Sequence, residues 1–159
     1  MLLARRVVLA GAACAETVVP RNAVLTVIYV SEGINTGLLE DLANAASDQA
    51  GAGLLRQFRD PIYHRTGFTI GGRYPSSVAE ASIEVSRRAL RSIDLREHEA
   101  SHPRIGVVDH ISVHPLGLGS EDAARQTGMT IARSLGTDGL PVLLYGELTE
   151  NGRGLAEVI

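Results

Sequence analysis

The spacing of apolar residues changes along the chain from that of strands to that of helices. Residues 23–30 are apolar and β-branched, which is typical of a buried strand, and Ser31-Glu32-Gly33 ends it. Residues 36–50 instead repeat leucine and alanine at helical spacing, with Asn35 or Thr36 placed to cap the start. The pattern therefore predicts a strand followed by an amphipathic helix.

The next stretch predicts two strands and a long helix. Residues 54–60 and 63–70 favour strands joined by a turn at Asp60-Pro61, and Gly71-Gly72 stops the second strand. The strongest helical pattern covers residues 75–93 and begins with a proline followed by two serines.

The remaining pattern predicts a strand at 104–113, a helix over 120–135 with an acidic first turn, and a short last strand at 141–145. The element order is then βαββαβαβ, and its first six elements are those of the split βαβ arrangement. We therefore expect an α+β fold: a ferredoxin-like, βαββαβ-based mixed sheet with helices packed on one face, in a single domain.

Residues 1–22 lie outside this pattern, and we expect a leader or linker there, ahead of one domain over residues 23–159. Two arginines precede an apolar run at 7–15 that is too short to span a bilayer. Three interpretations stay open: a signal peptide, an organellar transit segment, or untargeted sequence such as an additional strand. We expect a cytoplasmic protein, with organellar targeting by this segment as the alternative.

Composition narrows the class of protein. The chain has 159 residues, of which 45% are hydrophobic, enough for a core without disulfide or metal support. A net charge of −3 gives no basic field for nucleic acid or anionic lipid, so we expect neither nucleic-acid nor membrane binding. The single cysteine excludes an intramolecular disulfide and a cysteine-based zinc cage, which suits a reducing compartment.

Four of the five histidines fall close together: His98, His102, His110 and His114. The second pair lies on a predicted strand, where four residues separate the backbones by about 13 Å, too far for two rings to share one zinc ion. Pro103 removes His102 from any helix, so the first pair lacks helical spacing as well. We expect no metal.

His102 is the strongest candidate for chemistry. It lies in a polar junction at residues 97–104, in an extended conformation imposed by Pro103. We expect it in an ordered turn at one end of the sheet, where loops commonly carry sites, and a neutral imidazole there could accept a proton. The alternative is an ordinary solvated loop.

Asp109 is the second candidate. Strand alternation places it on one face with Val107 and Ile111, and His110 on the other. An ionised carboxylate on an apolar face needs a partner, either a structural one or one belonging to a site.

The segment His102-Pro103-Arg104-Ile105-Gly106-Val107-Val108-Asp109-His110, continuing into His114-Pro115-Leu116, resembles the motif of the glutamate formiminotransferase N-terminal subdomain, and most of all its stand-alone plant-type versions. Further segments match in the same order, at residues 29–35, 63–69, 93–98 and 141–146. The resemblance covers residues from about 25 to 159.

The resemblance implies transfer of a formimino group from N-formimino-L-glutamate to tetrahydrofolate, which is then a co-substrate, with His102 as general base. It implies that Arg104 and Arg65 pair with carboxylates of glutamate or folate, although either arginine could simply stabilise its loop. The substrate-binding residues expected on this basis are Arg104, Arg65, Ser31, Glu32 and Asp109.

The chain also departs from the family pattern. Tyr29 and His64 stand where the family has asparagine, and Arg56 and Phe58 replace an acidic pair. Ile159 precedes the folate-binding loop and the second subdomain of the family, so we expect a homodimer, or a partner that supplies the other wall.

Two hypotheses follow. One is a transferase completed by that partner, and the other is a non-catalytic folate-binding or interaction domain. An RNA-binding role is disfavoured, because the chain has only 4% aromatic residues besides its negative charge.

Overall fold

The computed structural model describes residues 19–118 and 120–158, so the predictions for the leader at residues 1–18 lie outside the described residues. The elements are β1 (Val24–Val30), α1 (Thr36–Ser47), β2 (Ala52–Asp60), β3 (Arg65–Gly72), α2 (Pro75–Ser92), β4 (Val108–Pro115) and α3 (Glu121–Thr137), with short 3₁₀ turns at Leu95–Glu97, Gly146–Leu148 and Leu155–Glu157. No helix in this part of the chain is long and apolar enough to cross a membrane.

The four strands form one sheet in the order β2-β3-β1-β4. Each pair of neighbours is antiparallel, so the expectation of a mixed sheet is wrong for the described strands. Each helical crossover does join parallel strands, but a third strand lies between them: β3 separates β1 from β2, and β1 separates β3 from β4. The α+β class is confirmed, and the strand order agrees with a ferredoxin-like arrangement.

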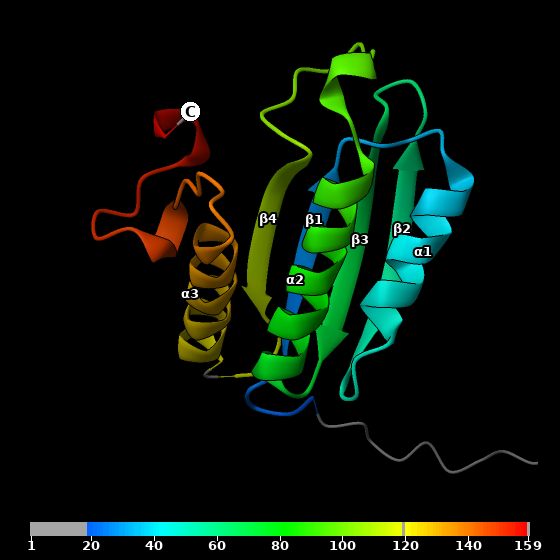
Figure 1. Ribbon diagram of the computed structural model, residues 1–159. Helices are drawn as coiled ribbons and strands as arrows, with labels where there is room; N and C mark the ends of the chain where they lie inside the picture. The colour runs from blue at the N-terminus through cyan, green and yellow to red at the C-terminus, as the bar shows by residue number, and fades with distance from the viewer. Residues whose placement is uncertain (1–18, 119, 159) are drawn as a thin grey trace, which may run out of the picture.

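The helices lie together on one face of the sheet, as predicted (Figure 1). Alternate residues of β1 are fully buried on that side, where Ile28 joins Phe68 of β3 and Leu42 of α1 in the core. The intervening residues of β1, including Tyr29, are only partly buried. The other face of the sheet is therefore the one without a helical layer.

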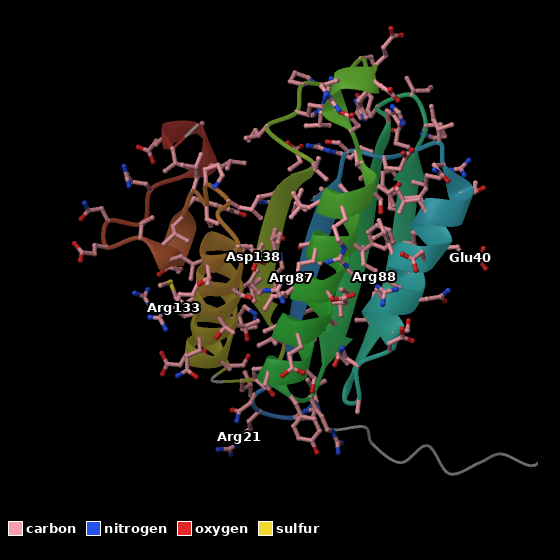
Figure 2. The ribbon with its side chains drawn as sticks, viewed as in Figure 1. Arg21, Glu40, Arg87, Arg88, Arg133 and Asp138 are labelled. Carbon is pink, nitrogen blue, oxygen red and sulfur yellow. The ribbon has the colours of Figure 1, made fainter. Side chains whose placement is uncertain are left out.

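Two arginines of α2 form ion pairs with residues of the neighbouring helical segments. Arg87 donates to Asp138, which follows α3, at 2.7 Å and 3.1 Å, and Figure 2 shows the pair between the two helices. Arg88 donates to Asp41 of α1 at 2.9 Å and to Glu84 on its own helix at 2.7 Å. These pairs are partly exposed, so each adds only a modest amount of stability.

Two predicted strands need correction. The strand expected at 104–113 begins only at Val108. The backbone just before it is bonded by Ser31 instead: the Ser31 N–H donates to the Val107 carbonyl, and the Ser31 hydroxyl donates to the Gly106 carbonyl. Residues 141–145 form no strand. Pro141 has no N–H to donate, and the apolar side chains of the segment line a pocket beside β4.

Candidate functional site

The candidate residues gather at the end of the sheet where three connections meet: the loop after β1, the β2–β3 turn, and the loop of residues 93–107 that leads into β4. The first contributes Ser31 and Glu32, the second His64 at the start of β3, and the third His102. These segments are far apart in the sequence, and the hydrogen bonds described below bring them together.

His102 lies in a bend of the third connection and is half-buried, so its placement in an ordered turn outside any helix is confirmed. Its Nδ1 faces the carbonyl oxygen of Pro103, which can only accept a hydrogen bond. The neutral ring therefore carries its proton at Nδ1 and its lone pair at Nε2. The ring of Tyr63 lies 4.9 Å from that of His102, between centroids, and supports it from the β2–β3 turn.

Asp109 finds its partner in Arg65. The two side chains form an ion pair in which Asp109 is 3% exposed and Arg65 24% exposed. The Arg65 guanidinium also lies 5.3 Å from the centre of the Tyr29 ring, and the Asp109 carboxylate accepts a hydrogen bond from the Ile105 N–H. The aspartate therefore joins β4, β3 and the loop that carries His102.

A β-bulge sets the direction of Asp109. Tyr29 pairs with His110 and Val30 with Val108, so one extra residue lies between the two pairs on β4. Simple alternation placed Asp109 on the face opposite His110, and this prediction is wrong. The extra residue shifts the alternation, and Asp109 reaches Arg65 above Tyr29, the ring against which His110 stacks.

Ser31 and Glu32 are engaged with the protein itself. Ser31 bonds the backbone ahead of β4, as described above, and the Glu32 carboxylate accepts hydrogen bonds from Ile34 N–H at 2.6 Å and Asn35 N–H at 2.9 Å. Burial favours the neutral acid, but these two bonds and a third from His64 outweigh it and hold the pKa of Glu32 below its usual value. Glu32 is thus a carboxylate at neutral pH.

Arg104 and Arg65 differ in availability. Arg65 is committed to Asp109, whereas Arg104 is an exposed residue whose Nη2 donates to the carbonyl of His98 at 2.7 Å. Arg104 lies two residues after His102, on the same loop. It is the better placed of the two to meet an anionic group that approaches His102.

The sequence marks His64 only as a departure from the family pattern. In the structure its ring bonds Glu32 and the His102 loop, and it stacks on His98. A signal was present in the sequence, because a histidine replaces asparagine directly before Arg65. The pairing with residues more than thirty positions away was not visible.

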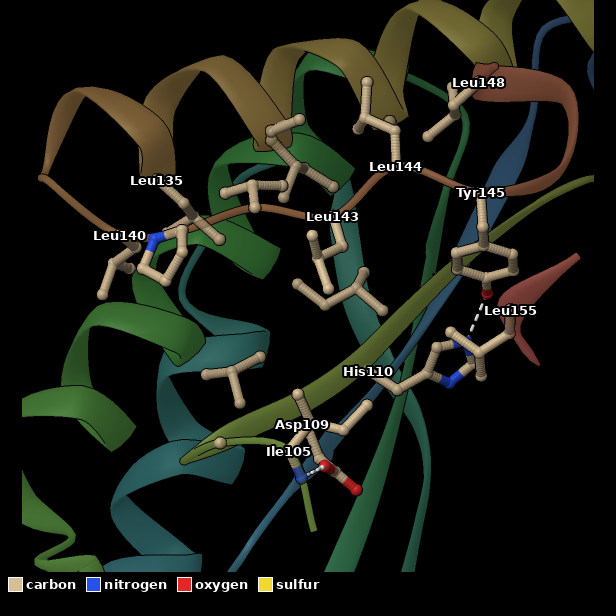
Figure 3. Close-up of a pocket in the computed structure, with 18 of the residues that line it drawn as sticks. Ile105, Asp109, His110, Leu135, Leu140, Leu143, Leu144, Tyr145, Leu148 and Leu155 are labelled. Atoms are coloured by element: carbon tan, nitrogen blue, oxygen red, sulfur yellow. Dashed lines mark hydrogen bonds between the residues drawn. The ribbon is translucent and has the colours of Figure 1, made fainter. Parts of the chain in front are cut away.

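A second feature, also unpredicted, is an apolar pocket of about 440 Å³ beside β4 (Figure 3). Leu135, Leu143 and Leu144 line it, and it extends to Ile105 of the candidate site. At one end Tyr145 and His110 share a hydrogen bond. Burial lowers the pKa of His110 and raises that of Tyr145, so both are neutral at pH 7.

Within residues 19–118 and 120–158, no group of three or more histidine, cysteine, aspartate or glutamate side chains is arranged to hold a metal ion. The chemistry available at the site is that of an imidazole base, a nearby guanidinium and buried ion pairs.

Comparison with known proteins identifies relatives. Residues 23–158 match the model of the formiminotransferase domain, N-terminal subdomain. The chain is 34% identical over 124 residues to a formiminotransferase cyclodeaminase-like protein of Arabidopsis thaliana, covering 75% of this chain and 42% of that protein. It is 32% identical over 124 residues to the formimidoyltransferase-cyclodeaminase of Rattus norvegicus, covering 76% of this chain and 22% of that protein.

A bacterial relative is the glutamate formimidoyltransferase of Streptococcus pyogenes serotype M1, 28% identical over 116 residues, which are 72% of this chain and 38% of that protein. The chain thus spans less than half the length of each of these relatives.

Proposed function

Because this chain belongs to the formiminotransferase family, as an N-terminal subdomain, we propose that it transfers a formimino group from N-formimino-L-glutamate to tetrahydrofolate. The observation that carries the proposal is His102, a half-buried imidazole with its lone pair at Nε2. Its loop is bonded to the β2–β3 turn through Glu99 and Ser101 and to β4 through Ile105. Tetrahydrofolate is the co-substrate.

The reaction needs one base that later acts as an acid. As the folate amine attacks the formimino carbon, a new N–C bond forms and the amine proton passes to Nε2 of His102. The C–N bond to glutamate then breaks, and the same proton passes to the departing glutamate nitrogen. Atoms and charge balance without any other reactant, and His102 returns to its neutral form.

The remaining site residues divide between binding and support. Arg104 is the residue we assign to a carboxylate of glutamate or folate, because a planar guanidinium pairs with a carboxylate through two hydrogen bonds and this one is exposed. Arg65 would have to exchange Asp109 for the substrate, so we assign Arg65 and Asp109 to the floor of the site. Ser31 and Glu32 form its wall.

A second candidate function is that of a non-catalytic folate-binding or interaction domain. A pocket usually encloses most of its ligand, and this chain corresponds to at most 42% of the relatives described above. A non-catalytic folate-binding or interaction domain would need only one wall. For the transferase, we propose that a second copy or a partner subunit completes the cleft against the helix-free face of the sheet.

Replacing His102 by alanine tests the base. Turnover should fall by about 10²–10⁴-fold while tetrahydrofolate affinity changes little, because proton transfer is expressed in the transition state. Formimino transfer is assayed spectroscopically and folate binding by calorimetry, with the chain alone and with a C-terminal family subdomain added.

His114→Ala is the control, because His114 is exposed on β4 and its ring bonds only its neighbour Ser112 in the described contacts. A wild-type chain that binds tetrahydrofolate but transfers nothing under either condition would leave the binding domain as the function.

A further inference from the structure

His64 bridges two of the three connections at the site. Its Nε2 lies 3.0 Å from a carboxylate oxygen of Glu32, and its Nδ1 lies 3.0 Å from the carbonyl oxygen of Glu99, in the His102 loop. It is also the only non-glycine residue in the described part of the chain with a positive φ, at 51°. Histidine rarely adopts this conformation, which persists only where surrounding contacts hold it.

Both ring nitrogens of His64 face acceptors. The Glu99 carbonyl oxygen can only accept a hydrogen bond, and the Glu32 carboxylate is ionised, so it accepts as well. Only the doubly protonated imidazolium donates to both at once. In that form His64 pairs with the Glu32 carboxylate and donates to the Glu99 carbonyl of the loop.

His98 packs flat against that cation. The ring centroids are 4.0 Å apart and the planes differ by 9°. His98 donates from Nε2 to the carbonyl oxygen of His64 at 3.2 Å, so the neutral ring keeps its lone pair at Nδ1. This Nδ1 is buried and has no hydrogen-bond partner, in a residue that is only 8% exposed.

Other contacts join the same two segments. The Ser101 hydroxyl donates to the carbonyl of Ile62 at 3.0 Å, and the Tyr63 ring lies against His102. The β2–β3 turn therefore supports the loop of residues 98–104, and His64 connects the two through its hydrogen bond to Glu99.

We propose that His64 is a positioning residue for His102: paired with Glu32 and stacked on His98, it clamps the loop of residues 98–104, and the clamp opens when His98 gains a proton. Protonation would place a second cation 4.0 Å from the first. The charged groups that face His98 are His64 from the turn before β3, Glu32 from the loop after β1, and Arg104 from its own loop.

The balance of these groups opposes a proton on His98. Burial lowers its pKa, and the positive charges of His64 and Arg104 lower it further, against the hydrogen bond to His64 and the charge of Glu32. His98 is therefore neutral at pH 7, and the clamp is expected to open in acid. The assignment of His102 as base rests on the proposed function, whereas the clamp can be tested without the reaction.

The test measures amide hydrogen exchange by NMR at the two ends of the loop, where the His98 N–H donates to the Leu95 carbonyl and the Ile105 N–H donates to Asp109. The intact chain is used from about pH 5 to pH 8, and the rates are corrected for intrinsic exchange. His64→Asn removes the cation but keeps a residue that tolerates the left-handed backbone. At neutral pH its loop should exchange at least about tenfold faster than the wild-type loop, while the core strands stay protected.

His98→Phe keeps a ring over the cation but cannot take a proton. The wild-type loop should lose protection as the pH falls toward about 5, and the His98→Phe loop should not. His114→Phe is the matched control and should behave as the wild type. Equal loop exchange in the wild type and His64→Asn, or acid opening that persists in His98→Phe, would overturn the proposal. If His98→Phe does not fold, a loop of His64→Asn that opens in acid as the wild type does would also overturn it.

Activity adds a separate readout. If transfer occurs, His64→Asn should lower kcat with little change in KM. The clamp stands, and the proposed function fails, if loop exchange responds as expected while no variant and no wild-type sample transfers the formimino group.

Discussion

The ion pair between Arg65 and Asp109 offers the sharpest test of how the site is held. Asp109→Asn removes the charge of a side chain that is 3% exposed, but it keeps an oxygen that accepts from the Ile105 N–H. The change therefore isolates the charge, and it leaves the Arg65 guanidinium without its anion.

The expected loss is worked from burial. Removing one member of a buried ion pair costs about 3–5 kcal/mol of stability. Arg65 is 24% exposed and lies over the Tyr29 ring, so water and the ring offset part of this loss, and we expect about 2–3 kcal/mol. With a urea m-value of about 1–3 kcal/mol per molar, the unfolding midpoint should fall by about 0.7–3 M.

The assay is urea unfolding followed by circular dichroism at pH 7, on Asp109→Asn, Arg65→Met and the double variant. The double variant should lose at least about 1 kcal/mol less than the two single losses added together, because it leaves no unpaired charge. Arg87→Met is the control: it breaks a pair with Asp138 in which the side chains are 39% and 36% exposed, and it should cost clearly less stability than Asp109→Asn. Equal losses in Asp109→Asn and Arg87→Met, with additive single losses, would refute the argument.

Two further predictions concern close packing and pH. Gly33→Ala would place a Cβ 2.5 Å from the backbone carbonyl oxygen of Asp60, so we expect a loss of about 1–3 kcal/mol in thermal unfolding. Gly136→Ala in α3 meets nothing within 4 Å and should stabilise the chain by up to about 1 kcal/mol; equal effects of the two changes would contradict this. Because the pKa values of His98 and His110 are lowered on folding, the unfolded chain binds more protons just below pH 6.5, their ordinary pKa. The free energy of unfolding should therefore fall between pH 7 and pH 5, and urea midpoints that do not change over this range would contradict the prediction.

The sequence by itself determined the elements whose signal is local. The helix predicted at 75–93 is α2, Pro75–Ser92. Apolar residues three and four positions apart lie on one face only when the segment is helical, so the local pattern is enough to predict it. Asn35 caps α1 through a 3.1 Å hydrogen bond from the Leu38 N–H, one of the two caps foreseen. Pro103 keeps His102 out of a helix through its own ring.

Only the tertiary structure decided the contacts between distant segments. The bulge that turns Asp109 toward Arg65 depends on the register of β4 against β1, which no period of two can reveal. Residues 141–145 have the composition of a strand, but a strand exists only where a neighbour offers hydrogen bonds. His64 contacts Glu32 and His98 because the antiparallel pairing of β1 and β3 brings the β2–β3 turn to the end of β1, beside the loop that leads into β4. These contacts depend on the assembled sheet, and no single segment of the sequence predicts them.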